Sequence, residues 1–96
     1  MKYIYALSAV TENTSRVLQR IGGIFARNRL NIEQLTVFET ENKGTSLFNI
    51  VIHSDSKTIE RVIKQLQKIV ELMEIKISSQ IPLSSFLAIN EYAAEV

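Results

Sequence analysis

The sequence contains no cysteine and no tryptophan, and it has only one proline, one histidine and three glycines among 96 residues. Without cysteine, disulfide bonds, thiolate metal sites and cysteine nucleophiles are excluded. His53 therefore has no second histidine or cysteine with which to hold zinc or to activate a nucleophile. We interpret it as a surface or capping residue at the end of a strand.

Long apolar runs are also missing, and none approaches the length of about 18 residues that spans a membrane. The N-terminal stretch MKYIYALSAV alternates tyrosines with small residues and lacks the longer apolar core of a signal peptide. A net charge of +1 provides no general attraction to nucleic acid or anionic lipid. We expect a cytoplasmic protein without a membrane span.

The composition predicts one globular domain, since 46% of the residues are hydrophobic and 22% are charged. No glycine-rich phosphate-binding motif is present. Glu33, Glu39 and Glu41 gather near a predicted hairpin, where a solvated loop explains them better than paired acid–base catalysis. Nothing in the sequence therefore indicates an enzyme.

Hydrophobic periodicity predicts the element order βαββαβ. Val17, Ile21 and Ile24 follow helical spacing, whereas Gly44 closes a polar stretch typical of a hairpin loop. The predicted strands cover residues 2–11, 31–39, 45–53 and 74–79, and the predicted helices cover residues 14–28 and 56–71. Right-handed crossovers would place both helices on one face of a four-stranded sheet.

Both faces of this sheet carry apolar side chains. Strict alternation puts Ile32 and Phe38 on one face and Leu35 and Val37 on the other. Ile75 and Ile77 of the last strand are expected to face the core. Helices on one side leave the other face without a cover, so the pattern predicts self-association, as a dimer.

Two glycines, Gly22 and Gly23, interrupt the first predicted helix. Each costs roughly 1 kcal/mol relative to alanine in a helix interior. We therefore predict that they permit close packing, either against the sheet or across a dimer.

The order βαββαβ also occurs in RNA-recognition motifs, which stack bases on sheet aromatics. Lys43 and Gly44 match the opening of that motif, but its aromatic positions hold other residue types, namely Thr45, Leu47 and Ile50. Tyr3 and Tyr5 lack stacking partners, so we interpret them as packing residues. An RNA-binding module is thus the least favoured of the functions that we consider.

Basic residues gather on or near the first predicted helix, namely Arg16, Arg20, Arg27 and Arg29. A solvated helix face accounts for them. A docking surface for a larger acidic partner is the alternative.

The stretch VTENTSRVLQRIGGIFARNRLNIEQLTV, residues 10–37, resembles the ACT domain of acetolactate synthase small regulatory subunits. The matching features are Glu12-Asn13 after the first strand, the Gly23-Ile24-Phe25 step, Arg27, and NIEQLTV from Asn31 to Val37. The second helix, TIERVIKQLQKIVELMEIKI, is also similar to this family. The resemblance covers about residues 2–80.

This resemblance implies a ferredoxin-like α+β ACT fold over residues 1–80, which leaves residues 81–96 as a C-terminal extension. The residues of this extension suit a short helix or an added edge strand, and we favour the helix because Ala93, Ala94 and the acidic residues dilute any strand pattern. It implies a homodimer with a continuous sheet and a branched-chain amino acid, usually valine, bound at the interface. Backbone N–H groups at a helix start suit the carboxylate of such a ligand. The implied effector-binding residues are Asn13, Thr14, Ser15, Arg16, Val17, Asn31 and Ile32.

The implied function is a non-catalytic regulatory subunit that activates an acetolactate synthase catalytic subunit. Thiamine diphosphate, magnesium and FAD would reside on that partner, and this chain would hold no cofactor. The alternative is a stand-alone ACT domain that senses another amino acid.

Two departures from the family pattern bear on regulation. Arg16 stands where the family commonly has a glycine that lets the ligand approach the backbone. The arginine either reaches a carboxylate or fills the pocket. Many members also continue into a second domain, whereas this sequence stops at Val96, as expected of a short ACT-only type or a shortened chain.

Overall fold

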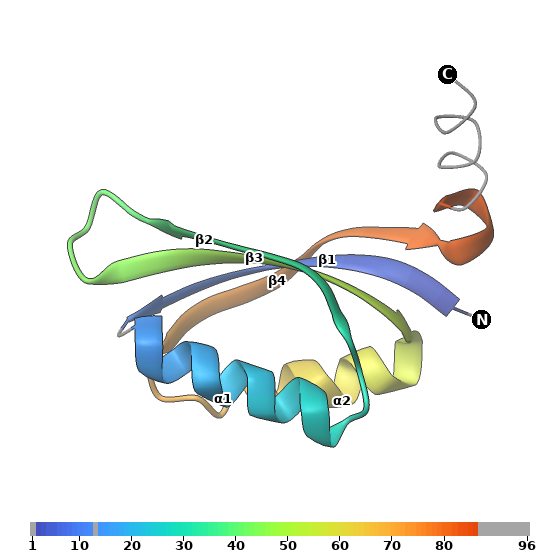
Figure 1. The fold of residues 1–96 in the computed structure, drawn as a ribbon, viewed down its shortest axis with the longest axis horizontal. Coiled ribbons are helices and arrows are strands. Elements are labelled where there is room, and N and C mark those ends of the chain that lie inside the picture. The colour runs from blue at the N-terminus through green and yellow to red at the C-terminus, as the bar shows by residue number, and fades with distance from the viewer. Residues whose placement is uncertain (1, 13, 87–96) are drawn as a thin grey trace.

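The computed structural model describes residues 2–12 and 14–86, and its elements follow the predicted order βαββαβ (Figure 1). They are β1 (Lys2–Glu12), α1 (Thr14–Arg27), β2 (Ile32–Glu39), β3 (Thr45–Asp55), α2 (Ser56–Leu66) and β4 (Leu72–Pro82). Residues 83–86 are helical, and the rest of the predicted C-terminal helix lies outside the described residues. The predicted α+β class is confirmed.

The sheet is antiparallel with the strand order β2-β3-β1-β4, so β2 and β4 form its two edges. Both helices lie on the same side of the sheet (Figure 1). Among the described residues, no helix is long and apolar enough to cross a membrane. The two central strands pair along their whole lengths, with Leu7 opposite Ile50 and Tyr5 opposite Ile52.

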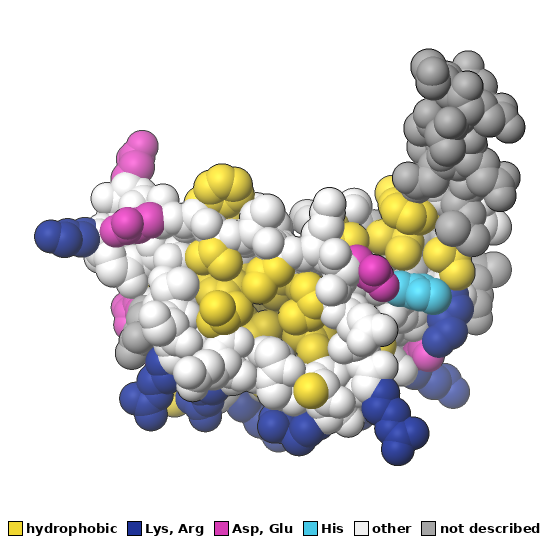
Figure 2. Space-filling model, viewed as in Figure 1, with side chains coloured by type: hydrophobic (Ala, Val, Ile, Leu, Met, Phe, Trp, Pro, Cys, Tyr) yellow, Lys and Arg dark blue, Asp and Glu magenta, His cyan; other side chains and the backbone are white. Residues whose placement is uncertain are grey.

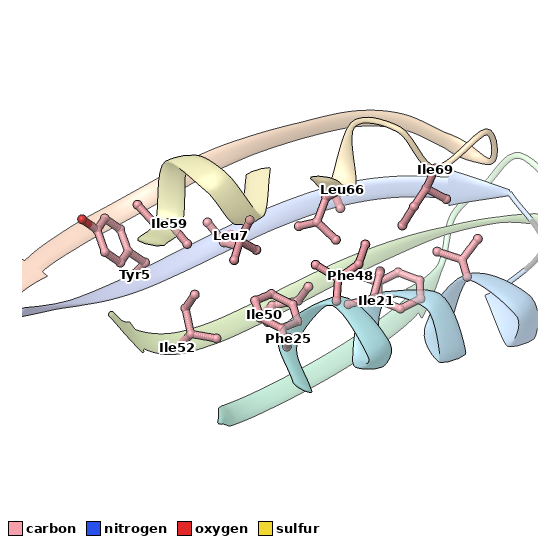
Figure 3. Packing of buried hydrophobic residues seen from close by; sticks show 14 residues of the cluster. Tyr5, Leu7, Ile21, Phe25, Phe48, Ile50, Ile52, Ile59, Leu66 and Ile69 are labelled. Atoms are coloured by element: carbon pink, nitrogen blue, oxygen red, sulfur yellow. The ribbon is translucent and has the colours of Figure 1, made fainter. Parts of the chain in front are cut away.

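The core lies between the sheet and the two helices. On β3, side chains alternate strictly between buried and half-buried, as period-two patterning predicts. The buried hydrophobic residues of this strand, Phe48, Ile50 and Ile52, are fully covered by the helices. Figure 3 shows the apolar faces of α1 and α2 meeting it, through Ile21 and Phe25 on one helix and Ile59 and Leu66 on the other.

The alternation predicted for β2 is wrong. A bulge between Ile32 and Gln34 shifts the register against β3, so Ile32 and Leu35 both pack against the core. One extra residue in a strand reverses the side-chain alternation beyond it. The other face of β2 therefore carries Thr36 and Phe38, and Phe38 is 57% exposed.

The second helix is shorter than predicted and ends at Leu66 instead of residue 71. Its start agrees with the sequence, since the Asp55 side chain caps it by accepting the Thr58 backbone N–H at 2.7 Å. Beyond Leu66 the chain turns, which buries Ile69 in the core and leaves Val70 88% exposed. Packing of Ile69, rather than continued helical spacing, decides where α2 ends.

The last strand is longer than predicted, because β4 pairs with β1 from Leu72 to Pro82. Ile75 packs against the core as expected. Ile77 lies opposite the core residue Leu7 and so shares the core face, as expected, but it remains 41% exposed because β4 is an edge strand.

The tyrosines and the glycine pair also occupy informative positions. Tyr5 is 1% exposed and Tyr3 packs on the same core, so neither is available on the open sheet face for stacking bases.

A Cβ at Gly22 would meet nothing within 4 Å, and one at Gly23 would meet only the end of the Arg27 side chain at 3.4 Å. Close packing of the glycines against the sheet is therefore wrong, whereas packing across a dimer stays a prediction.

Candidate functional site

The start of α1 opens onto a hollow of about 390 Å³ beside the β2–β3 hairpin. Thr14, the first residue of α1, hydrogen-bonds through its hydroxyl to that of Ser46 on β3. This bond holds the helix start against the sheet. The hollow is lined by Thr14, Val37, Glu39, Gly44, Thr45 and Ser46.

Hydroxyl groups dominate this part of the molecule. Ser46 is 4% exposed, and Thr11, its cross-strand neighbour on β1, is fully buried. The hydroxyl oxygen of Thr11 has no hydrogen-bond partner among the described residues. A buried polar group without a partner is costly, but Thr11 is not among the residues that line the hollow, so its hydroxyl does not reach a ligand there.

The hairpin loop forms the outer wall of the hollow. The Thr45 hydroxyl donates to the Asn42 carbonyl at 2.7 Å, and the Thr40 and Thr45 hydroxyls also hydrogen-bond. Gly44 has φ of +88°, a conformation that side-chain-bearing residues rarely adopt. The predicted role of Gly44 in the hairpin turn is confirmed.

The side chain of Arg16 points away from this hollow. Its Nε lies 3.6 Å from Oε2 of Glu71, in the segment between α2 and β4, and Arg20 Nη1 lies 3.4 Å from the other oxygen of the same carboxylate. Arg16 is absent from the described residues that line the hollow. Arg16 therefore pairs with a carboxylate of its own chain and does not line the hollow, and its expected contact with the carboxylate of an effector stays a prediction.

The other predicted residues at the start of α1 have different surroundings. Val17 is fully buried in the core, so its side chain does not reach the hollow. Ser15 is exposed on the first turn. Asn13 lies outside the described residues.

Asn31 and Ile32 lie at the far end of α1 from Thr14. An α-helix of 14 residues is about 20 Å long at 1.5 Å per residue. Asn31 is exposed just before β2, and Ile32 is half-buried as the first residue of that strand. A single chain therefore splits the predicted site into two halves.

The β2 edge between these halves exposes apolar surface. Val37 is 38% exposed on β2, and Leu18 is 39% exposed on α1. Gly22 lies one helical turn from Leu18 on the same face, where an added Cβ would enter open space. Figure 2 shows hydrophobic side chains gathered at the centre of this face, over the region where β2 and α1 lie in Figure 1.

Sequence reasoning missed the hairpin side of the hollow, namely Val37, Glu39, Thr45 and Ser46. No local pattern marks these residues as binding residues, because β3 pairing alone brings them beside Thr14. Within the described residues, no group of three or more histidine, aspartate or glutamate side chains could hold a metal ion.

Comparison with known proteins identifies the relatives of this chain. A family model described as the AHAS small subunit-like ACT domain matches residues 7–74. The probable acetolactate synthase small subunit of Archaeoglobus fulgidus is 41% identical over 71 residues, which cover 74% of this chain and 45% of that protein. The small subunit of Bacillus subtilis is 38% identical and covers 78% of this chain and 43% of its own length.

Solved structures agree with these relatives. The crystal structure of the acetolactate synthase small subunit from Thermotoga maritima has a TM-score of 0.68 and 34% identity, covering 77% of this chain and 46% of that one. The ACT domain of GTP pyrophosphokinase from Chlorobium tepidum has a TM-score of 0.67 and 14% identity, and the match covers 80% of this chain and 99% of that one. This second likeness shows the fold alone. The chain spans less than half the length of the small subunits it matches.

Proposed function

Since this chain belongs to the family of acetolactate synthase small-subunit ACT domains, we propose that it binds and activates an acetolactate synthase catalytic subunit. The chain itself is a regulatory and non-catalytic component. Thiamine diphosphate, magnesium and FAD belong to the catalytic partner. The observation that carries the proposal is the family match over residues 7–74, which spans both halves of the candidate site.

The regulatory site forms between two copies of the chain. β2 is an edge strand with unpaired backbone groups, and such an edge is a template for pairing with another strand. β2 starts at Ile32 and returns to Glu39, which lines the hollow beside Thr14. Antiparallel pairing of two β2 strands brings Asn31 of one copy toward the hollow of the other.

A branched-chain amino acid, with valine as the first choice, suits the shared site. Backbone N–H groups at the start of α1 favour its carboxylate. Glu39 offers a negative charge to its ammonium group, and Val37 offers an apolar contact to its side chain. Asn31 of the second copy closes the site.

Enzyme activation tests the main proposal. Adding the chain to a cognate catalytic subunit should raise the rate of acetolactate formation, and the two proteins should co-elute. An inactive chain with Phe48→Ala serves as the control, since loss of this buried ring costs about 3–5 kcal/mol of folding free energy. Unchanged activity together with separate elution would contradict the proposal.

A thermal-shift screen of amino acids tests the effector. Ligands that bind the native state raise Tm. Stabilisation by valine, leucine or isoleucine supports the branched-chain assignment. Stabilisation by a different amino acid, with no effect on the synthase, would favour the alternative of a stand-alone sensing domain.

A further inference from the structure

A second groove runs between α1 and α2 on the side of the helices away from the sheet. Its volume is about 410 Å³, and its floor contains Ile24, Ile69 and the bare backbone of Gly23. Three cationic side chains line it, Arg20 and Arg27 from α1 and Lys68 just after α2. No carboxylate is among its lining residues.

Hydrogen bonds hold one end of this groove in place. The side-chain Nδ2 of Asn28 donates to Oε1 of Gln65 on α2 at 2.8 Å, and Arg61 Nε donates to the side-chain Oδ1 of Asn28 at 2.9 Å. Gln65 itself lines the groove. The spacing between the two helices is therefore set by side-chain bonds as well as by the core.

The cations of the groove differ in their partners. Arg20 pairs with Glu71, 3.4 Å away. Neither Arg27 nor Lys68 forms an ion pair within the part of the chain that the structure describes. Two unneutralised cations on one groove repel each other and favour the approach of negative charge.

Charge is distributed unequally over the molecule. Figure 2 shows lysine and arginine side chains along the lower border, where α1 and α2 lie in Figure 1. The hairpin end carries acidic side chains, including Glu39 and Glu41. The net charge of +1 therefore conceals a basic helix layer.

We propose that the groove between α1 and α2 is the docking surface for an acidic segment of the catalytic subunit. This inference rests on the function proposed above. Arg27 of α1 and Lys68 just after α2, which form no ion pair among the described residues, line this groove from its two sides. The segment that fits presents carboxylates to these two cations, and the apolar floor at Ile24 and Ile69 accepts a small hydrophobic side chain beside them.

The lining of the groove favours a protein segment over a small anion. Its polar groups are the ends of long side chains, and neither helix directs its N-terminus into it, since Thr14 and Ser56 begin α1 and α2. Compact phosphate sites use converging backbone N–H groups. An open groove with spaced cations instead complements charge distributed along a surface.

Charge reversal tests the docking surface. The full chain carrying Arg27→Glu and Lys68→Glu should bind the catalytic subunit about tenfold more weakly or worse, since like charges now face each other. The neutral pair Arg27→Gln and Lys68→Gln should weaken binding less and reduce its salt dependence. Lys43→Glu, in the hairpin loop, is the matched control and should bind as the unaltered chain does.

The outcomes separate this inference from the proposed function. If the unaltered chain binds and both double variants bind equally well, the groove is not the docking surface, although the regulatory function stands. If the unaltered chain fails to bind, the proposed function fails and this inference falls with it. If inorganic polyphosphate raises Tm without competing with the catalytic subunit, the groove is an anion site and the inference is wrong. If the double glutamate variant does not fold, the double glutamine variant decides whether the groove is the docking surface, through its binding to the catalytic subunit at a series of salt concentrations.

Discussion

Arg16 forms an ion pair with Glu71, with its Nε 3.6 Å from the Oε2 of that carboxylate. Arg20 lies 3.4 Å from the other oxygen of this carboxylate, so Arg16 and Arg20 together hold the segment between α2 and β4. The backbone of the same segment receives the Glu12 N–H at 2.9 Å. Arg16, the residue that departs from the family pattern, is thus turned toward the segment between α2 and β4 and not toward the hollow beside Thr14.

This orientation predicts the effect of Arg16→Ala on valine binding. The valine affinity should stay unchanged, because the guanidinium does not occupy the hollow. Stability should fall by no more than about 1 kcal/mol, as expected for an exposed ion pair. Isothermal titration calorimetry with valine checks the first expectation and urea unfolding the second. A gain of valine binding in Arg16→Ala would mean that the side chain is a plug.

The two glycines should respond differently to alanine. Gly23→Ala should raise the free energy of unfolding by about 1 kcal/mol, because helix propensity improves and only the flexible Arg27 end must move. Gly22→Ala should give the same gain in a monomer but weaken the dimer, since its Cβ projects on the Leu18 face. Urea unfolding and sedimentation measure the two effects. Equal dimerisation of the two variants would place Gly22 outside the interface.

Val37→Lys should convert the proposed dimer to a monomer. A charge at this position opposes pairing of two β2 edges, yet Val37 is 38% exposed and the chain should still fold. Light scattering after size exclusion gives the mass, and circular dichroism verifies folding. Met73→Lys, on the opposite edge strand and 58% exposed, is the control and should remain dimeric. A monomeric Met73→Lys variant together with a dimeric Val37→Lys variant would place the interface on β4.

Asp55 should make stability fall in acid. The hydrogen bond from the Thr58 backbone N–H lowers the pKa of the Asp55 carboxyl, with a smaller contribution from the charge of Lys2. A lowered folded-state pKa gives stability that is present above the unfolded value of about 3.9 and is lost as the pH falls through the folded value.

Asp55→Asn should therefore unfold with a weaker pH dependence below about pH 4, because asparagine caps a helix without titrating in that range. Urea unfolding at a series of pH values measures the difference. Glu74→Gln, on exposed β4, is the matched control. Identical pH profiles for the unaltered chain and Asp55→Asn would show that the cap does not depend on ionisation.

The local pattern of residue types was sufficient to predict β3 and the start of α2. Alternation along Phe48, Ile50 and Ile52 matched a strand covered on one side, and the Ser-Asp-Ser stretch supplied the observed cap at Asp55. These features depend on neighbours within a few residues. The same reasoning failed at the bulge in β2 and at the end of α2, because packing of Ile32 and Ile69 against the core overrides the local pattern there.

The candidate site was predictable only in part. The resemblance around Thr14 and Asn31 marked both ends of α1, but no pattern in the sequence placed Glu39 or Ser46 beside the helix start. Strand pairing creates that proximity, since β2 and β3 fold back on each other. In the proposed dimer, pairing at the free edge of β2 would bring these two segments together in one site.

By itself, the sequence determined the element order, the apolar face of each helix and the family to which the chain belongs, because these depend on residue type and spacing. Only the tertiary structure decided the partner of Arg16, the open space at Gly22 and the convergence of Arg27 with Lys68 on one groove. Each of these depends on how two elements distant in sequence pack, and such packing is set by the core as a whole.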